Sequence, residues 1–382
     1  MPKRTNTCWD IFCTVIDNYG DIGTCWRLAQ ILHHDHGQQV RLWVDDLEAL
    51  KTLVPATQNI PIQTLLGIEI HHWSVNFPDT APAQVVIETF GCTLPASYVH
   101  AMQMKPPLAW INLEYMSCED WVSDVHGQTS LLAHGLLKHF IIPSLLPHSG
   151  GLLREKNLLK QRDSFLASPT QQQAWSAQWH VPEPAANSFK ISLFAYENPQ
   201  LGALLTSLSH APQAVTVYLP ASRLLNSLRE IVHNPALEAG DCYQYGNLTL
   251  HILPFLPQAE YDHLLWLCDI NFVRGEESLT RAIWAGKPFI WQIYPTNDQA
   301  HHSKLKAFLD VYTEHSPADH LMQLCAWMQH WNGILQNTTD AYTFLNDLHQ
   351  HRAWYNARST VLAQVPDLSQ NLLNVAFHAP TG

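Results

Sequence analysis

Two aspartates and two glycines are crowded into residues 17–23, and this combination can do chemistry on a cationic group. A carboxylate can orient such a nucleophile and take its proton, and a glycine lets the backbone turn tightly beside a ligand. Residues 11–16 predict a buried strand before the segment, and residues 24–36 predict a helix after it. Open α/β sheets bind ligands in such loops. From this segment alone, a plain cap and turn is the commoner explanation. The candidate residues here are Asp17, Tyr19, Gly20 and Asp21.

A second acidic, glycine-containing junction lies at residues 274–278. It follows a predicted strand over residues 269–273 and opens a predicted helix that ends near Gly286. A helix start binds anions such as diphosphate, and a carboxylate binds the vicinal hydroxyls of a ribose. A carboxylate pair that only stabilises the helix dipole, by about 0.3–1 kcal/mol, is the alternative interpretation. The candidate residues are Arg274, Gly275, Glu276, Glu277 and Ser278.

Further polar side chains follow two other predicted strands of the first half. Glu88 comes directly after residues 85–87, and Glu114 and Tyr115 follow residues 108–112. Because parallel strands end at one edge of a sheet, these side chains can face the same crevice as Asp17 and Asp21. Caps or rim residues would explain each of them singly just as well.

Strand and helix patterns alternate twice along the chain, which predicts two βαβ series with mostly parallel sheets. We expect an α/β protein with two Rossmann-like domains that face a cleft. Residues 317–382 contain helical patterns only, and we expect their aromatic residues to be core and the helices to pack across the cleft. The predicted divisions are an N-terminal domain over residues 1–150, a linker over 151–184, a nucleotide-binding domain over 185–316 and the helices of 317–382.

Composition restricts the class of protein. The 382 residues suit two domains, and 21 Lys and Arg against 33 Asp and Glu give a net charge of −12. No basic run favours nucleic acid, whereas an acidic surface suits a cationic acceptor. The sequence contains no apolar run of about 18 residues, so we expect no membrane span. We also expect no signal peptide, and the eight scattered cysteines predict a reducing, cytoplasmic location.

Several cofactor motifs are missing from the sequence. No G-x-G-x-x-G follows a strand, which argues against NAD, and there is neither a P-loop nor an Asp-x-Asp motif. The 23 histidines have no metal-ligand spacing, so we expect no metal. A sugar-nucleotide enzyme built on this chain would use helix dipoles and side chains on the diphosphate.

Taken together, the motifs resemble those of the bacterial protein-arginine rhamnosyltransferases, which modify translation elongation factor P. The resemblance extends from about Trp9 to His301, and one departure is Glu277, where the family usually has Asp. The motifs are residues 9–13, 17–23, 26–29, 88–91, 112–115, 194–196, 254–255, Gln258, residues 272–278 and residues 293–295.

The resemblance implies a GT-B fold, dTDP-β-L-rhamnose as donor, inversion at the anomeric carbon, no cofactor, and an arginine of elongation factor P as acceptor. It places Asp17 and Asp21 on the acceptor side as catalytic residues. We expect Phe194 or Tyr196 against the thymine, Gln258 at the base edge, and Glu276 at the ribose. The donor-pocket residues that the resemblance implies are Phe194, Tyr196, Gln258, Glu276, Glu277, Ser278 and Tyr294. Phe255, Arg274 and Gly275 are further candidate substrate-binding residues.

Chemistry from the residues agrees with this assignment. A guanidinium is permanently charged and must lose a proton as it attacks, so one aspartate can accept that proton while the other orients the group. We assign Asp21 as base and Asp17 as the orienting carboxylate. The alternatives are another metal-independent GT-B enzyme, such as a small-molecule glycosyltransferase or an epimerase, and a catalytically silent nucleotide-sugar-binding protein.

Overall fold

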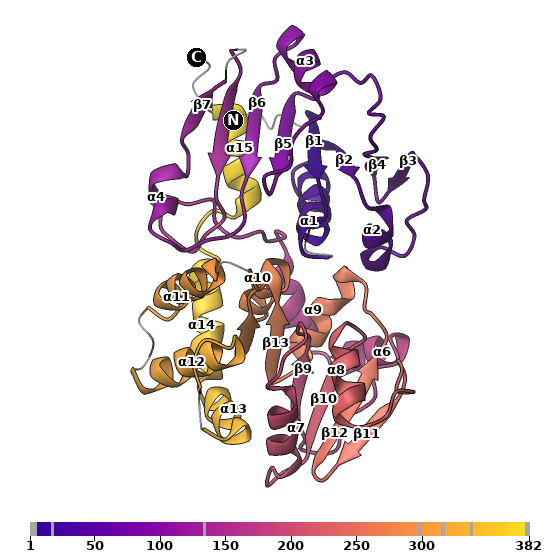
Figure 1. Cartoon of the computed structure of the whole chain (residues 1–382), viewed down its shortest axis with the longest axis vertical. Coiled ribbons are helices and arrows are strands. Elements are labelled where there is room, and N and C mark those ends of the chain that lie inside the picture. Colours follow the sequence, from indigo (N-terminus) through magenta and orange to yellow (C-terminus); the bar gives the residue numbers. More distant parts are fainter. Residues whose placement is uncertain are drawn as a thin grey trace. The chain divides into compact units, whose positions relative to one another are not determined.

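The computed structural model describes residues 6–16, 19–132, 135–296, 299–314, 316, 318–336 and 339–378. The chain divides into two compact α/β units. The first contains Met1–Lys156, Lys306–Tyr312 and Ala363–Gly382, and the second contains Asn157–Leu305 and Thr313–Leu362. Each unit is built around its own sheet (Figure 1).

The sheet of the first unit has the strand order β3-β4-β2-β1-β5-β6-β8-β7. Its pairs are parallel except at the two edges, where β3 and β7 run antiparallel to their neighbours. The strands are β1 (Cys8–Cys13), β2 (Gln39–Val44), β3 (Ile62–Leu65), β4 (Ile68–His72), β5 (Val85–Thr89), β6 (Ala109–Leu113), β7 (Thr129–Leu131) and β8 (Leu137–Ile141). The helices are α1 (Gly20–His34), α2 (Leu47–Leu53), α3 (Ala96–Met104), α4 (Trp121–Val125) and α15 (Leu368–His378).

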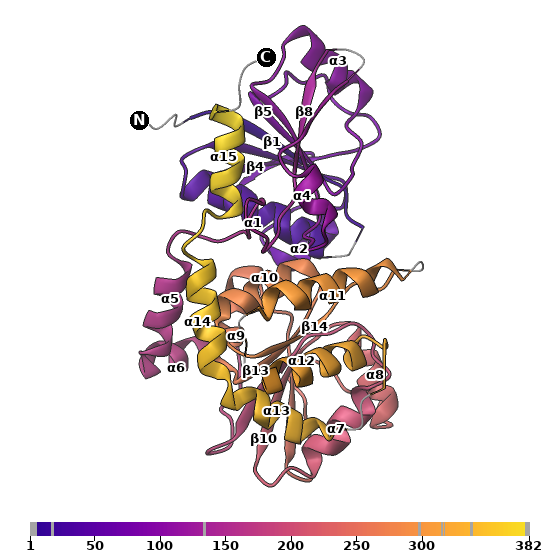
Figure 2. The same ribbon diagram turned by 90° about the vertical axis from the view of Figure 1, so that its left-hand side faces the viewer.

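The last helix of the chain, α15, belongs to the first unit. Figures 1 and 2 both place it alongside the strands of that unit. Its Phe377 meets the ring of Trp9 on β1 edge to face, with centroids 6.2 Å apart. His36, just after α1, contacts Ser369 of α15 at 2.8 Å. The C-terminal segment therefore completes the core over the first strand and first helix.

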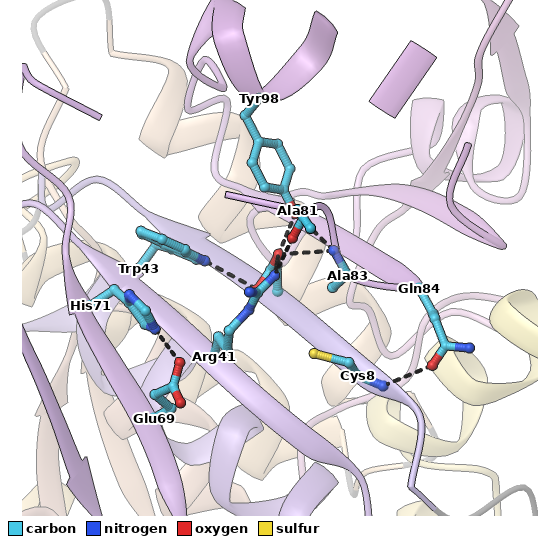
Figure 3. A network of polar contacts seen from close by, with 10 residues as sticks. Cys8, Arg41, Trp43, Glu69, His71, Ala81, Ala83, Gln84 and Tyr98 are labelled. Atoms are coloured by element: carbon cyan, nitrogen blue, oxygen red, sulfur yellow. Dashed lines mark hydrogen bonds and ion pairs between the residues drawn. The ribbon is translucent and has the colours of Figure 1, made fainter. Parts of the chain in front are cut away.

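A buried carboxylate ties the centre of this sheet together (Figure 3). Asp10 on β1 is fully buried and accepts two hydrogen bonds of 2.6 Å from the Arg41 guanidinium. Trp43, Tyr98 and the backbone N–H of Ala83 also donate to it. Such a charge is tolerated inside a protein because it is paired and fully hydrogen-bonded. The network fastens β1, β2, α3 and the segment that leads into β5.

The sheet of the second unit has the order β11-β12-β10-β9-β13-β14, and only β11 is antiparallel. The strands are β9 (Phe189–Leu193), β10 (Val215–Pro220), β11 (Cys242–Tyr245), β12 (Leu248–Leu253), β13 (Ile270–Arg274) and β14 (Phe289–Gln292). The helices are α5 (Leu158–Leu166), α6 (Pro169–Gln178), α7 (Leu201–Ser209), α8 (Leu224–Ile231), α9 (Gln258–Leu267), α10 (Gly275–Ala285), α12 (Ala318–Trp331), α13 (Ala341–Gln350) and α14 (Arg352–Leu362). Helix α11 (Ala300–Tyr312) is divided, because its residues up to Leu305 belong to the second unit and Lys306–Tyr312 belong to the first.

Both sheets reverse their strand order at the first strand of the series. In the first unit, β1 lies between β2 and β5, and in the second unit β9 lies between β10 and β13. Loops at the carboxyl ends of strands on the two sides of such a switch point diverge and leave room for a ligand. The chain leads from the ends of β1 and β5 to Asp21 in the first turn of α1 and to Phe90. It leads from the ends of β9 and β13 to Phe194 and to Glu276 in the first turn of α10.

Element boundaries differ from the predicted ones at several points. Helix α1 begins at Gly20 and not at residue 24, so Asp21 lies in its first turn. Helix α10 begins at Gly275, with Glu276 and Glu277 in its first turn, and ends at Gly286, as predicted, which has the left-handed conformation. Residues 341–362 form two helices, α13 and α14.

The aromatic residues of the C-terminal helices are largely core, as predicted. Trp327 and Phe344 stack with centroids 4.7 Å apart, and both are buried, as is Trp331. The helices do not form one group, however. Most of residues 317–362 belong to the second unit, whereas residues from Ala363 onward belong to the first.

Candidate active site

Asp21 lies in the first turn of α1 and is almost completely buried. Its Oδ2 accepts a hydrogen bond of 2.8 Å from the N–H of Ile16, at the far side of the β1–α1 loop. Tyr19 is the N-cap of the helix, without a side-chain capping bond, and Gly20 is the first helical residue. The carboxylate of Asp21 therefore closes the loop rather than capping the helix, and the helix dipole favours its negative charge. Asp17 lies outside the described residues.

Glu88 is held inside the first unit by two partners. Lys138 on β8 donates to Oε1 at 2.5 Å, and Trp110 on β6 donates to Oε2 at 3.0 Å. The Lys138 ammonium also lies 4.4 Å from the centroid of the Trp110 ring. Burial raises the pKa of Glu88, and Lys138 opposes that effect. Both carboxylate oxygens of Glu88 are bound within this network, and contact of Glu88 with substrate remains a prediction.

Two aromatic rings stack at the carboxyl ends of β5 and β6. Tyr115 lies face to face with Phe90, with centroids 4.5 Å apart and an interplanar angle of 16°. Phe90 has φ of +55°, a conformation that is strained for a bulky residue. Its N–H donates to the carbonyl of Leu113 at 2.8 Å, which holds the strained turn in place. Glu114, beside Tyr115, accepts a hydrogen bond from the Asn112 side chain.

The start of α10 forms the second half of the candidate site. Gly275 has φ of +60°, which favours glycine, and its carbonyl accepts a 2.7 Å hydrogen bond from the indole of Trp291. The Ser278 hydroxyl accepts from the N–H of Arg274 at 3.0 Å and donates to the Arg274 carbonyl. Ser278 thus closes the first turn, and its predicted donation to a diphosphate remains a prediction.

Both glutamates of the α10 start are held by side chains from other elements. Glu276 forms an ion pair with Lys304 of α11, and each of these side chains is about one-fifth exposed. Glu277 accepts a 3.0 Å hydrogen bond from the amide of Gln258, the first residue of α9. The predicted contact of Gln258 with a base edge remains untested by this arrangement. The Glu277 side chain therefore reaches toward the first turn of α9.

Helices α9 and α10 are fixed to each other below these contacts. Arg281 of α10 donates to both carboxylate oxygens of Asp262 of α9, at 2.8 and 2.6 Å, and both side chains are buried. A bidentate Arg–carboxylate pair sets the relative orientation of the groups that it joins. It therefore sets the register in which Gln258 meets Glu277.

Aromatic residues predicted for a nucleobase surround an arginine. The Arg274 guanidinium lies 4.4 Å from the Phe194 centroid and 4.7 Å from the Tyr196 centroid. Tyr196 meets the partly exposed Tyr294 edge to face at 5.7 Å, and Phe255 meets Phe194 at 6.4 Å. The structure therefore brings the predicted aromatic residues of the second unit together around a cation.

Sequence analysis missed three residues that shape these sites. Lys138 and Lys304 are the cationic partners of two predicted carboxylates. Tyr261 packs against Phe194 at 5.5 Å, and burial together with Glu277 raises the pKa of its hydroxyl. The sequence could have indicated Tyr261 through its helical spacing from Leu264 and Leu265, with which it lies on the buried face of α9. The lysines stand alone in the sequence, with no motif that would mark them.

The described residues contain no group of three or more His, Cys, Asp or Glu side chains placed to hold a metal ion. All eight cysteines are free thiols, and Cys13, Cys25, Cys118 and Cys268 are buried. Within the described part of the chain, no helix has the length and apolar character needed to cross a membrane.

The sequence matches a family described as Elongation-Factor P (EF-P) rhamnosyltransferase EarP over residues 9–377. A protein-arginine rhamnosyltransferase of Pseudomonas putida is 42% identical over 371 residues, covering 96% of this chain and 97% of that protein. The chain belongs to the EarP family. The motif resemblance is thereby confirmed, and this EarP family member is a glycosyltransferase. A protein-arginine rhamnosyltransferase of Pseudomonas aeruginosa is 43% identical and covers 85% of this chain and 86% of its own length.

Solved structures agree with the family assignment. A structure described as the basis for EarP-mediated arginine glycosylation of translation elongation factor EF-P superposes with a TM-score of 0.70 and 32% identity. The match covers 98% of this chain and 100% of the chain in that structure. The spinosyn rhamnosyltransferase SpnG, at a TM-score of 0.51 and 10% identity, covers 96% and 99% and shares the fold alone. The predicted α/β class and GT-B fold are confirmed.

Proposed function

We propose that this EarP family member transfers L-rhamnose from dTDP-β-L-rhamnose to an arginine side chain of translation elongation factor P, with inversion. The observation that carries the proposal is the placement of the motif residues at both topological switch points. One switch point has a buried carboxylate for a cation. The other has an aromatic cluster and a helix start for a nucleotide diphosphate. The family assignment supports both substrates.

In the proposed reaction, a guanidino nitrogen of the acceptor arginine attacks the anomeric carbon from the face opposite the leaving group. The new C–N bond forms as the bond between that carbon and the β-phosphate oxygen breaks, and its electron pair leaves with the oxygen. The guanidinium proton passes to a carboxylate, which we assign to Asp21. Asp17 orients the other guanidino nitrogens. The products are rhamnosyl-arginine and dTDP.

In the second unit, the donor nucleotide would take the place prepared by the aromatic cluster. A thymine ring can stack on Phe194 or Tyr196. The ribose hydroxyls would bind Glu276, and the diphosphate would bind the N–H groups that open α10. A cytoplasmic location and activity without a metal remain predictions that accompany this assignment.

The test is incubation of the purified protein with dTDP-β-L-rhamnose and elongation factor P, followed by intact mass spectrometry. We expect the factor to gain one deoxyhexose, and replacing its acceptor arginine by lysine should abolish the gain. A change in the sugar nucleotide without modified factor would instead indicate an epimerase. Binding of dTDP with no turnover would indicate a silent nucleotide-sugar-binding protein. Either outcome contradicts the proposal.

A further inference from the structure

The start of α10 presents a conflict of charge. Its first turn carries Glu276 and Glu277, yet the proposed function places an anionic diphosphate at the same turn. Two carboxylates next to a diphosphate repel it, whereas the N–H groups of the turn attract it. A cation at the helix start is therefore needed for the diphosphate to bind well.

Lys304 supplies a cation at that position. Its ammonium forms an ion pair with Glu276 and is mostly shielded from water, since only about one-fifth of the side chain is exposed. Lys304 lies in the second turn of α11, and residues 300–305 belong to the same unit as α10. The contact therefore lies within one compact unit.

Two other polar side chains lie near the same helix start. Glu277 accepts a hydrogen bond from the neutral amide of Gln258. The Arg274 guanidinium lies over the rings of Phe194 and Tyr196. Lys304 brings its positive charge to Glu276, in the first turn of α10.

We propose that Lys304 is a diphosphate-binding residue of the donor site and the counter-ion of the departing dTDP. This inference rests on the proposed function. An ammonium has three N–H donors, so Lys304 can keep its ion pair with Glu276 through one of them and bind phosphate oxygens with the others. When the glycosidic bond breaks, its electron pair adds negative charge to the β-phosphate oxygen. A cation already in place stabilises that growing charge.

The competing role is purely structural, in which Lys304 only holds Glu276 for the ribose. The two roles differ in which part of the ligand depends on the lysine. If Lys304 binds phosphate, its removal lowers the affinity for dTDP and not that for thymidine. If Lys304 only positions Glu276, its removal lowers both affinities, because both ligands contain the ribose.

The experiment measures the affinities of thymidine and dTDP by calorimetry for the parent protein, Lys304→Met and Lys304→Arg. We expect Lys304→Met to weaken dTDP about 10- to 100-fold, the loss of a charge-assisted contact, with thymidine unchanged within about twofold. Lys304→Arg should retain most of the dTDP affinity. Added salt should lower the dTDP affinity of Lys304→Met less than that of the parent protein. Lys304→Gln, which retains a polar side chain, repeats the test if Lys304→Met unfolds.

The matched control is Lys306→Met, on the same helix. Lys306 forms an exposed ion pair with Asp310 at 2.6 Å. The Lys306→Met variant should therefore keep the parent affinities for thymidine and dTDP. Equal losses for thymidine and dTDP in Lys304→Met, or no loss at all, would overturn the role of Lys304 while leaving the donor assignment standing. Failure of the parent protein to bind dTDP would overturn the donor assignment and this inference together.

Discussion

Replacing Asp21 by Asn tests the central chemical assignment with little structural change. The carboxamide oxygen can accept the N–H of Ile16 in place of Oδ2, which now does so at 2.8 Å, so the β1–α1 loop should keep its shape. The variant loses the charge-assisted part of one buried hydrogen bond. Bonds to charged groups contribute about 1.5–3 kcal/mol and neutral ones about 0.5–1.5 kcal/mol, so unfolding should become easier by about 1 kcal/mol.

Turnover should respond far more strongly than stability. A carboxamide cannot accept the guanidinium proton, and the loss of a positioned base lowers a rate by about 10²–10⁴-fold. That factor corresponds to about 2.7–5.4 kcal/mol of transition-state stabilisation. The assay is the initial rate of rhamnosyl transfer to elongation factor P, followed by intact mass at saturating donor, with dTDP affinity measured in parallel and expected to stay unchanged.

Asp46→Asn is the matched control in the same unit. Asp46 is the N-cap of α2 and accepts hydrogen bonds of 3.0 Å from the N–H groups of Glu48 and Ala49. An Asn caps a helix about as well, so both stability and rate should stay near those of the parent protein. If Asp21→Asn transfers rhamnose at the parent rate, Asp21 only closes the loop, and the mechanism proposed here is wrong.

Three further predictions concern the donor, the core and pH. Glu276→Ala should lower the affinity for dTDP measured by calorimetry, and Asp21→Ala should not. Equal losses of affinity would contradict the assignment of donor binding to the second unit. Arg41→Met leaves the buried Asp10 charge unpaired, so urea unfolding should show a loss of about 3–5 kcal/mol, and a loss under 1 kcal/mol would refute this. Burial lowers the pKa of His320 to about 4, so below pH 6.5 the unfolded state binds a proton that the native state does not. Stability should therefore fall by about 3 kcal/mol between pH 6.5 and 4, and His320→Phe should remove that part of the fall.

The central strands were predictable because they are short apolar runs that end at a turn. Ile11 to Cys13, for example, are fully buried, and nothing but a buried parallel strand suits such a run. The edge strands β3, β7 and β11 were not predicted. They are short, largely exposed and antiparallel, and their pairing comes from a neighbouring strand rather than from their own pattern.

The positions of the motif residues followed from the sequence, whereas their partners did not. Parallel strands end at one edge, so the segments after β1, β5, β9 and β13 had to lie at sheet ends in their units. Lys138 comes 50 residues after Glu88 and Lys304 comes 28 residues after Glu276. Such pairs depend on how elements pack in three dimensions, and no local period encodes that packing. The stacking of Arg274 on Phe194 is likewise a tertiary contact between two strand ends.

In the proposed function, two similar acidic motifs serve ligands of opposite charge. Asp21 and Glu276 both lie in the first turn of a helix that follows the carboxyl end of a strand at a switch point. The carboxylate of Asp21 is bound by the backbone N–H of Ile16, a neutral donor that stabilises the negative charge without cancelling it. Glu276 is bound by the ammonium of Lys304, which does cancel it. In the proposed function, the first arrangement would attract a guanidinium, and the second would leave the N–H groups of its helix to attract a diphosphate. On this proposal, the partner of each carboxylate distinguishes the acceptor site from the donor site, because the two motifs are alike in sequence.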